Sequence, residues 1–227
     1  MNLAVISFAP VIIIACYIYF RDKYEKEPLR LLMKALAAGA LAVIPVVLFE
    51  SLFTFIGPGE PSVIQAGYTA FIVAGITEET FKFLVFILFI WRNQHFNEKF
   101  DGIVYAVFIS LGFAAVENLL YVTQLGFDVG VSRALTAVPA HALFGIVMGY
   151  HLGIAKMIPE RRTKHMLLGL LVPILLHGIY DFIIMSGHPL ALAIFLPYLV
   201  FLWFNGFRKM KVIAESSRFK SKQIHEG

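Results

Sequence analysis

Long apolar stretches, separated by short polar segments, dominate the chain up to about position 207. Seven of these stretches are long enough to cross the hydrocarbon core of a membrane as helices, which takes about 20 residues. The second is the longest and contains Pro45, so a kink is expected there. The pattern predicts an all-α, polytopic transmembrane helical bundle of about seven spans, near residues 2–20, 31–56, 68–91, 102–123, 134–156, 165–185 and 189–207.

The composition supports a membrane protein. Hydrophobic residues make up 59% of the 227 residues and charged residues 15%, whereas an ordinary globular domain has about 45–50% and about 25%. This excludes a disordered chain, a secreted disulfide scaffold and a soluble cytosolic enzyme. The single cysteine, Cys16, also excludes an internal disulfide and a Cys-based zinc cluster. We expect one integral membrane domain over residues 1–207 and a basic tail over residues 208–227.

The positive charges predict the orientation of this bundle. Seventeen of the 19 Lys and Arg residues lie in or beside segments that share one side of a seven-span bundle. Such segments are cytoplasmic in most membrane proteins. The C-terminal tail is therefore expected in the cytoplasm and the N-terminus outside, and the net charge of +4 reflects topology rather than a nucleic-acid partner.

Several ionisable residues lie inside the predicted spans, where an unpaired charge costs about 2.5–3.5 kcal/mol. They are expected to face the bundle interior and to mark a functional site. At about 1.5 Å per residue, the ionisable residues of spans three to six lie about 6 to 15 Å below the outer ends of their helices. The site is therefore expected to open toward the outside. Glu50, which has no partner in its own motif, is expected at the outer interface. The full set is Glu50, Glu78, Glu79, Lys82, Glu117, His141, His177 and Asp181.

The spacing of the charged residues in the third span suggests a general base. Lys82 is i+4 to Glu78 and i+3 to Glu79, so it can neutralise one carboxylate and leave the other to activate water. A structural Glu–Lys pair is the alternative, although such a pair needs only one glutamate.

The other candidates lie on three different spans. Asp181 is i+4 to His177 and can orient its imidazole or join it as a ligand, unless the pair only holds helices together. His141 matches them in depth, which favours a catalytic or ligand role over that of a core histidine. Glu117 and Asn118 can supply a carboxylate and an amide donor for an oxyanion, or can simply form hydrogen bonds between helices.

Other intramembrane protease signatures do not occur. The chain has no His-Glu-x-x-His, no Gly-x-Ser-Gly and no Gly-x-Gly-Asp. With these excluded, buried carboxylates and histidines near an aqueous opening suit the attack of activated water on an amide.

Six short segments, in order over about seven-tenths of the chain, resemble the PrsW-type intramembrane proteases. That family is related to the CAAX prenyl endopeptidases and the bacteriocin-processing Abi membrane proteins. Each segment is short, but their combined order is specific. They are Asp22-Lys23-Tyr24-Glu25-Lys26-Glu27-Pro28, Glu78-Glu79-Thr80-Phe81-Lys82, Asp101-Gly102-Ile103-Val104-Tyr105, Gly112-Phe113-Ala114-Ala115-Val116-Glu117-Asn118, His141-Ala142-Leu143-Phe144-Gly145 and His177-Gly178-Ile179-Tyr180-Asp181-Phe182.

The resemblance implies an Abi-like protease domain in a bacterial cell membrane. It also implies a site-1 cut in a single-span anti-sigma factor on the extracytoplasmic side, as part of a stress response. The catalytic set would be Glu78, Glu79, Glu117, His141, His177 and Asp181, with Lys82 and Asn118 in supporting or substrate-binding roles.

Two departures from the wider superfamily leave the cofactor open. The basic residue of the Glu-Glu motif is Lys82, one position earlier than the usual arginine, and Glu117 replaces a histidine. A divalent metal such as zinc could be held by His141, His177 and Glu117. In the metal-free alternative, which we prefer because carboxylates are in excess and Lys82 is present, Glu78 or Glu79 activates water directly.

Two other classes remain in competition with a protease. A proton- or cation-coupled transporter also gathers buried carboxylates, but it predicts polar residues near both membrane faces, and the inner half of this bundle is expected to be nearly bare of them. A non-catalytic scaffold or immunity protein is the third reading.

Overall fold

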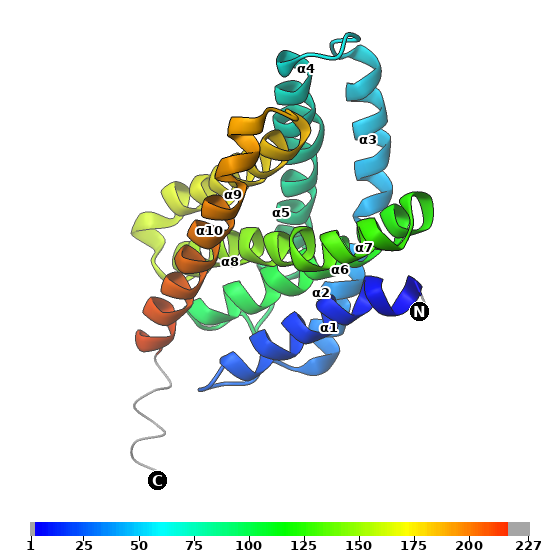
Figure 1. Cartoon of the computed structure of the whole chain (residues 1–227). Coiled ribbons are helices and arrows are strands. Elements are labelled where there is room, and N and C mark those ends of the chain that lie inside the picture. Colours follow the sequence, from blue (N-terminus) through cyan, green and yellow to red (C-terminus); the bar gives the residue numbers. More distant parts are fainter. Residues whose placement is uncertain (1–2, 218–227) are drawn as a thin grey trace.

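The structure, a computed structural model, describes residues 3–217 as a bundle of packed helices (Figure 1). Within this range there is no strand, which confirms the all-α class. The elements are α1 (Leu3–Arg21), α2 (Leu29–Leu41), α3 (Val43–Ile56), α4 (Val63–Tyr68), the π-helix η1 (Thr69–Ile76), α5 (Thr77–Phe89), α6 (Lys99–Leu125), α7 (Phe127–Leu135), α8 (Ala137–Met157), the short 3-10 helix η2 (Pro159–Arg161), α9 (Arg162–Met185) and α10 (Pro189–Glu215).

Six helical stretches of the described chain are long and apolar enough to cross a membrane. They match six of the seven predicted spans. The remaining span corresponds to the unbroken run of α4, η1 and α5, which carries Glu78, Glu79 and Lys82. This run packs against α6 and α9, so its charged residues are shielded by protein and not by lipid.

The helix boundaries differ from the predicted spans at three places. The second span is interrupted at Ala42, three residues before Pro45, because proline cannot donate the backbone hydrogen bond that the preceding turn needs. The fifth begins at Ala137, and the segment before it, which lies between two predicted spans, forms the additional helix α7. The last helix continues beyond residue 207 to Glu215, and the rest of the predicted tail, residues 218–227, lies outside the described residues.

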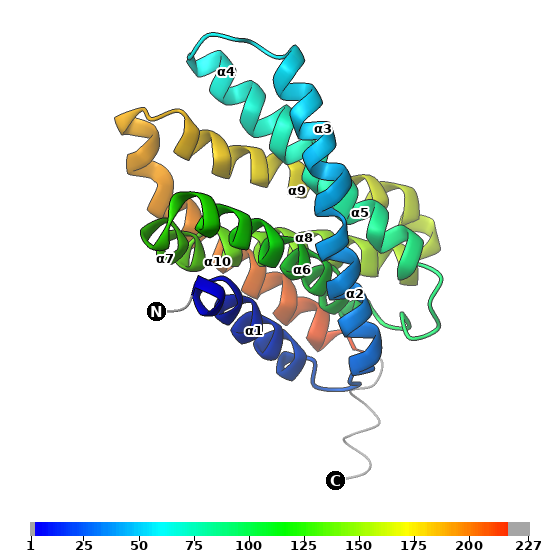
Figure 2. The same cartoon turned by 90° about the vertical axis from the view of Figure 1, so that its right-hand side faces the viewer.

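α6 is the central helix and packs on α1, α2 and α8 (Figure 2). Its contact with α8 is close because glycines face each other across it. A methyl group placed on Gly149 would collide with the backbone of Gly102, and one on Gly153 with the backbone of Lys99. Small residues allow such close packing of helices in membranes. The contact fixes α8, which carries His141, against α6, which carries Glu117.

A second group of acidic residues is buried at the opposite end of the bundle from the predicted site. Asp22 and Glu27, in the turn between α1 and α2, are 1% and 3% exposed, and Asp101 of α6 is fully buried. The Tyr105 hydroxyl donates a hydrogen bond to Glu27. Burial, reinforced by Asp101, raises the pKa of Asp22 from 3.8 to about 7. The same causes raise the pKa of Glu27 from 4.5 to about 9. We had expected the inner half to be nearly bare of buried polar groups, and this expectation was wrong.

These raised pKa values predict a loss of stability at alkaline pH. The folded protein keeps protons on Asp22 and Glu27 that the unfolded chain releases from about pH 4, so stability falls as pH rises toward the folded pKa values of about 7 and 9. The melting temperature in detergent should fall by at least about 3 °C between pH 6 and pH 9, since 1 kcal/mol is worth about 2–4 °C in a chain of this size. Glu27→Gln should remove much of this fall, and Glu60→Gln, in an exposed loop, should not. An equal fall in both variants would contradict the prediction.

Candidate active site

The π-helix η1 positions the two neighbouring glutamates at the start of α5. The Thr77 hydroxyl donates to the carbonyl of Ile72, five residues earlier, at 3.2 Å. Gly75 lies so close to Ile174 and Gly178 of α9 that a methyl group there would crowd their backbone atoms. Single π-helical turns occur frequently at functional sites. Here the segment brings the first turn of α5 directly against α9, which carries His177.

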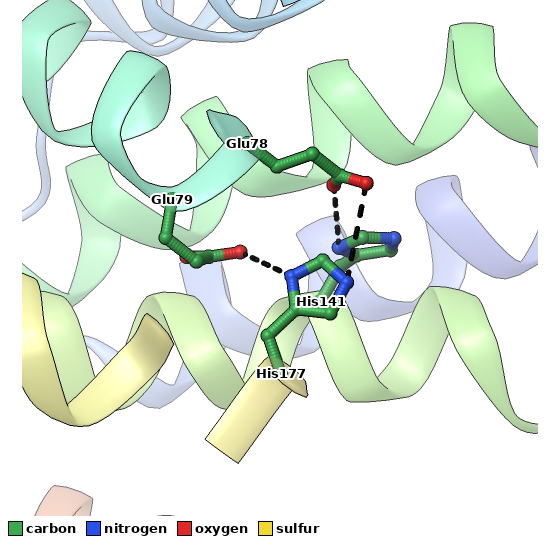
Figure 3. Close-up of side chains that lie close together, drawn as sticks. All are labelled: Glu78, Glu79, His141 and His177. Atoms are coloured by element: carbon green, nitrogen blue, oxygen red, sulfur yellow. Dashed lines mark hydrogen bonds and ion pairs between the residues drawn. The ribbon is translucent and has the colours of Figure 1, made fainter. Parts of the chain in front are cut away.

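Four of the predicted residues converge from three helices (Figure 3). Glu78 and Glu79 come from α5, His141 from α8 and His177 from α9. Each is at most 4% exposed, and one potential ligand atom from each lies within 4.8 Å of those of the others. The structure therefore brings these four predicted residues together. We call them the Glu/His group.

Lys82 makes more contacts than its spacing predicted. Its Nζ lies 3.0 Å from Glu78 Oε2 and 2.8 Å from Glu79 Oε1, so it pairs with both glutamates and not with one. It also lies 3.1 Å from His141 Nδ1 and 4.2 Å from the centre of the Phe113 ring. The expectation that one carboxylate remains unpaired was wrong, because i+3 and i+4 neighbours of one lysine lie on adjacent parts of the helix surface.

His177 lies between two carboxylates. Its Nδ1 is 2.9 Å from Glu79 Oε1 and its Nε2 is 3.1 Å from Asp181 Oδ2. Phe144 stacks on the ring with a centroid distance of 5.0 Å. When both carboxylates are ionised they only accept hydrogen bonds, so both ring nitrogens must donate. The predicted contact between Asp181 and His177 is present. The ring is held in place by Glu79, Asp181 and Phe144.

His141 is oriented from the opposite direction. Because the Lys82 ammonium has no acceptor, His141 Nδ1 must accept from it, which leaves the proton on Nε2. This Nε2 donates to Glu117 Oε2 at 2.8 Å. Glu117 Oε1 in turn lies 2.9 Å from Arg133 Nη2. Glu117 therefore contacts the far ring nitrogen of His141 and lies outside the Glu/His group.

Arg133 of α7 was not predicted as a site residue. It also donates to Asn118 Oδ1 at 3.3 Å, and its guanidinium lies 3.9 Å from the centre of the Tyr121 ring. Asn118 itself is fully buried, and its amide donates to the Ser7 carbonyl of α1 at 3.4 Å. Asn118 is thus turned away from the Glu/His group. The only sequence signal for Arg133 was its position, as the one basic residue outside span three and the segments predicted to be cytoplasmic.

A cavity of about 590 Å³ lies beside the Glu/His group. α3, η1, α6, α7 and α9 contribute most of its walls, and it extends to Thr54, Gln124 and Met185 near the ends of α3, α6 and α9. Of the Glu/His group, only Glu78 lines it. Glu50 lines the same cavity, so it faces the bundle interior like the other charges within the predicted spans. The cavity gives Glu78 access to the end of the bundle where loops 57–62 and 186–188 lie.

The donor chemistry of the Glu/His group fits a divalent metal ion. Two imidazoles and carboxylate oxygens are the ligands that zinc takes from His and Glu. The predicted metal ligands were His141, His177 and Glu117. In the structure, Glu78 and Glu79 lie beside the two histidines in the place predicted for Glu117. Glu117 occupies the position of an outer carboxylate that orients a ligating histidine. Metal binding by His141, His177 and Glu117 together stays a prediction.

Comparison with known proteins agrees with the motifs. A family model described as "PrsW family intramembrane metalloprotease" matches residues 27–205. Three relatives named "Protease PrsW" come from Bacillus subtilis, Halalkalibacterium halodurans and Clostridioides difficile. Their sequences are 37%, 33% and 35% identical to this chain, respectively. The aligned parts cover 92%, 96% and 89% of this chain and 94%, 99% and 87% of the relatives. No solved structure matches the chain.

These matches decide between the three competing classes. The relatives are proteases by name, and the match covers most of both chains. A transporter and a non-catalytic scaffold are thereby set aside in favour of a membrane-embedded peptide hydrolase. The chain belongs to the PrsW family of intramembrane proteases.

Proposed function

We propose that this protein makes the first, site-1 cut in a single-span membrane anti-sigma factor, on the extracytoplasmic side of a bacterial cell membrane. Residues 1–207 form its protease domain. The observation that carries the proposal is the position of Glu78, which faces the cavity and belongs to the buried Glu/His group.

Glu78 is the general base in this proposal. Its side chain is 6% exposed and reaches the cavity, whereas that of Glu79 is fully buried. A water molecule in the cavity beside Glu78 gives up its proton to the carboxylate as its oxygen attacks the substrate carbonyl. Glu79 holds Lys82 and His177 in place through its hydrogen bonds to both.

His177 is the donor to the developing oxyanion or the leaving nitrogen. Its Nε2 lies 3.1 Å from Asp181 and 3.9 Å from Glu78, and both carboxylates line the cavity. A donor held by fixed charges before the reaction stabilises negative charge without reorganisation. His141 supports Lys82 and is kept in one tautomer by Glu117.

When a metal ion is bound, Glu78, Glu79, His141 and His177 would hold it, and it would supply Lewis-acid activation of water. The roles of Asp181 and Glu117 in orienting the two imidazoles are the same in either case, because each contacts a ring nitrogen.

The choice of substrate rests on orientation and on the motif resemblance. The cavity extends toward the end of the bundle whose loops, 57–62 and 186–188, have no Lys or Arg. Segments poor in positive charge are extracytoplasmic as a rule. With the N-terminus outside and the C-terminus cytoplasmic, the cavity receives the outer flank of a substrate helix.

The location of the cut tests this proposal. The purified protein is reconstituted in lipid vesicles with a single-span anti-sigma factor, and the fragments are identified by mass spectrometry. We expect one main cut on the extracytoplasmic side of the substrate span. Cleavage only on the cytoplasmic side, or no cleavage of any single-span protein, would contradict the proposal.

Arg133 is expected to matter for activity without contacting the reacting atoms. Arg133→Ala leaves Glu117 without its charged partner and loosens His141, so kcat should fall about 10- to 100-fold, as for other residues that orient a catalytic or ligating histidine. Arg133→Lys should recover part of this activity, because a lysine can pair with Glu117 but cannot also contact Asn118 and stack on Tyr121.

The matched control is Arg162→Ala, since Arg162 contacts the Ala155 carbonyl at the opposite end of α8. Its kcat should stay within about twofold of the wild-type value. Steady-state kinetics at several substrate concentrations separate kcat from KM. An Arg133→Ala variant with unchanged kcat would show that Glu117 and His141 do not need this support.

A further inference from the structure

The ammonium of Lys82 lies where the atoms that could ligate a metal converge. Its Nζ is 3.0 Å from Glu78, 2.8 Å from Glu79 and 3.1 Å from His141. A lysine ammonium has three N–H donors. Each has one acceptor, and all three acceptors belong to the Glu/His group.

A metal ion would require these same atoms. Zinc binds carboxylate oxygens and imidazole nitrogens at about 2.0–2.2 Å, well inside the hydrogen-bond distances to Lys82. An ion at that distance from Glu78, Glu79 and His141 takes the lone pairs that the ammonium uses. Its double positive charge would also lie within a few ångströms of a buried cation, at a distance where like charges repel strongly.

We propose that the Lys82 ammonium and a divalent metal ion are alternative cations of the Glu/His group, and that Lys82 thereby sets the affinity of the protein for metal. This inference rests on the site of the proposed function. It concerns which cation the site holds and does not depend on whether a peptide bond is cut there.

The surroundings of Lys82 support this role. The side chain is fully buried, and Phe113 covers the ammonium at 4.2 Å from the ring centre. Its positive charge offsets one of the two negative charges of Glu78 and Glu79. Removing the lysine leaves two adjacent buried carboxylates, which is unfavourable unless another cation enters.

Zinc titration of the purified full chain tests the proposal. The protein is stripped with a chelator, and Zn²⁺ binding is followed by calorimetry in competition with a weaker chelator. Lys82→Met should bind one Zn²⁺ per chain at least about 100-fold more tightly than the wild type, since it removes a like charge next to the ion. Adding His141→Asn should abolish this gain. Lys211→Met, at a lysine that is 71% exposed, should leave the affinity within about twofold.

A second pair of variants covers the case in which Lys82→Met does not fold. Glu79→Gln with Lys82→Met removes one charge of each sign and leaves Glu78, His141 and His177 as ligands. This double variant should bind Zn²⁺ at least about 10-fold more tightly than Glu79→Gln alone.

Equal affinities within either pair, or no binding by any of these variants, would overturn the proposal. Cleavage in the vesicle assay could still be observed in that case. Conversely, tight binding by Lys82→Met without any cleavage by the wild type would support the cation exchange and contradict the proposed function.

Discussion

Replacing Glu78 by Gln should lower kcat by about 10²- to 10⁴-fold, the usual contribution of a general base. The amide keeps the shape of the side chain and can still accept a hydrogen bond from Lys82, which lies 3.0 Å away. The melting temperature and KM should therefore change little. Steady-state cleavage of a single-span substrate in detergent, together with thermal unfolding, measures both effects.

Two neighbouring glutamates serve as controls. Glu50→Gln changes a carboxylate that lines the same cavity but lies outside the Glu/His group, so kcat should stay within about threefold. Glu79→Gln weakens bonds to Lys82 and His177 in a fully buried place, so it should lower the melting temperature as well as kcat. If Glu50→Gln and Glu78→Gln had equal effects, the base would not be Glu78.

Replacing His177 by Ala should lower kcat about 10²- to 10³-fold, because it removes the proposed donor to the oxyanion or leaving group. Asp181→Asn should cost only about 10- to 100-fold, since Asp181 acts through the imidazole and an amide still contacts it. Cleavage rates at saturating substrate compare the two variants.

His188 provides the matched control for this pair. It lies in loop 186–188, at the same end of the bundle, and is exposed. His188→Ala should keep kcat within about twofold. A His177→Ala variant with more than a tenth of the wild-type kcat would remove His177 from the chemistry.

Much of the fold was predictable because a membrane imposes length and composition on each helix. The apolar stretches identified the long helices, and Pro45 predicted the interruption near Ala42. Helix α7 was not predicted, since residues 127–135 include Asp128, Gly130 and Arg133 and lack an apolar run long enough to mark a span. The π-helix before Thr77 was also missed, because one extra residue per turn leaves no pattern in an apolar segment.

The residues of the candidate site were predictable for the same reason, since a charge inside a span stands out against its apolar neighbours. The contacts between them were not predictable. The pairing of Lys82 with His141 and the contact of Glu117 with Arg133 join residues that are distant in the sequence. Asp22 and Glu27 were read as loop residues, and only the packing of α6 against that turn buries them.

The proposed mechanism places the scissile bond in the cavity beside Glu78. Cross-linking of trapped substrate tests it most directly. A Glu78→Gln variant with Cys16→Ser and Val47→Cys carries one thiol, on the α3 wall of the cavity. It is cross-linked to single-span substrates that have a cysteine at successive positions. The account predicts the highest yield within a few residues of the bond that the wild type cuts. A variant that keeps only Cys16, exposed on α1, should give no such maximum. A maximum from Cys16 with none from Val47→Cys would contradict the account.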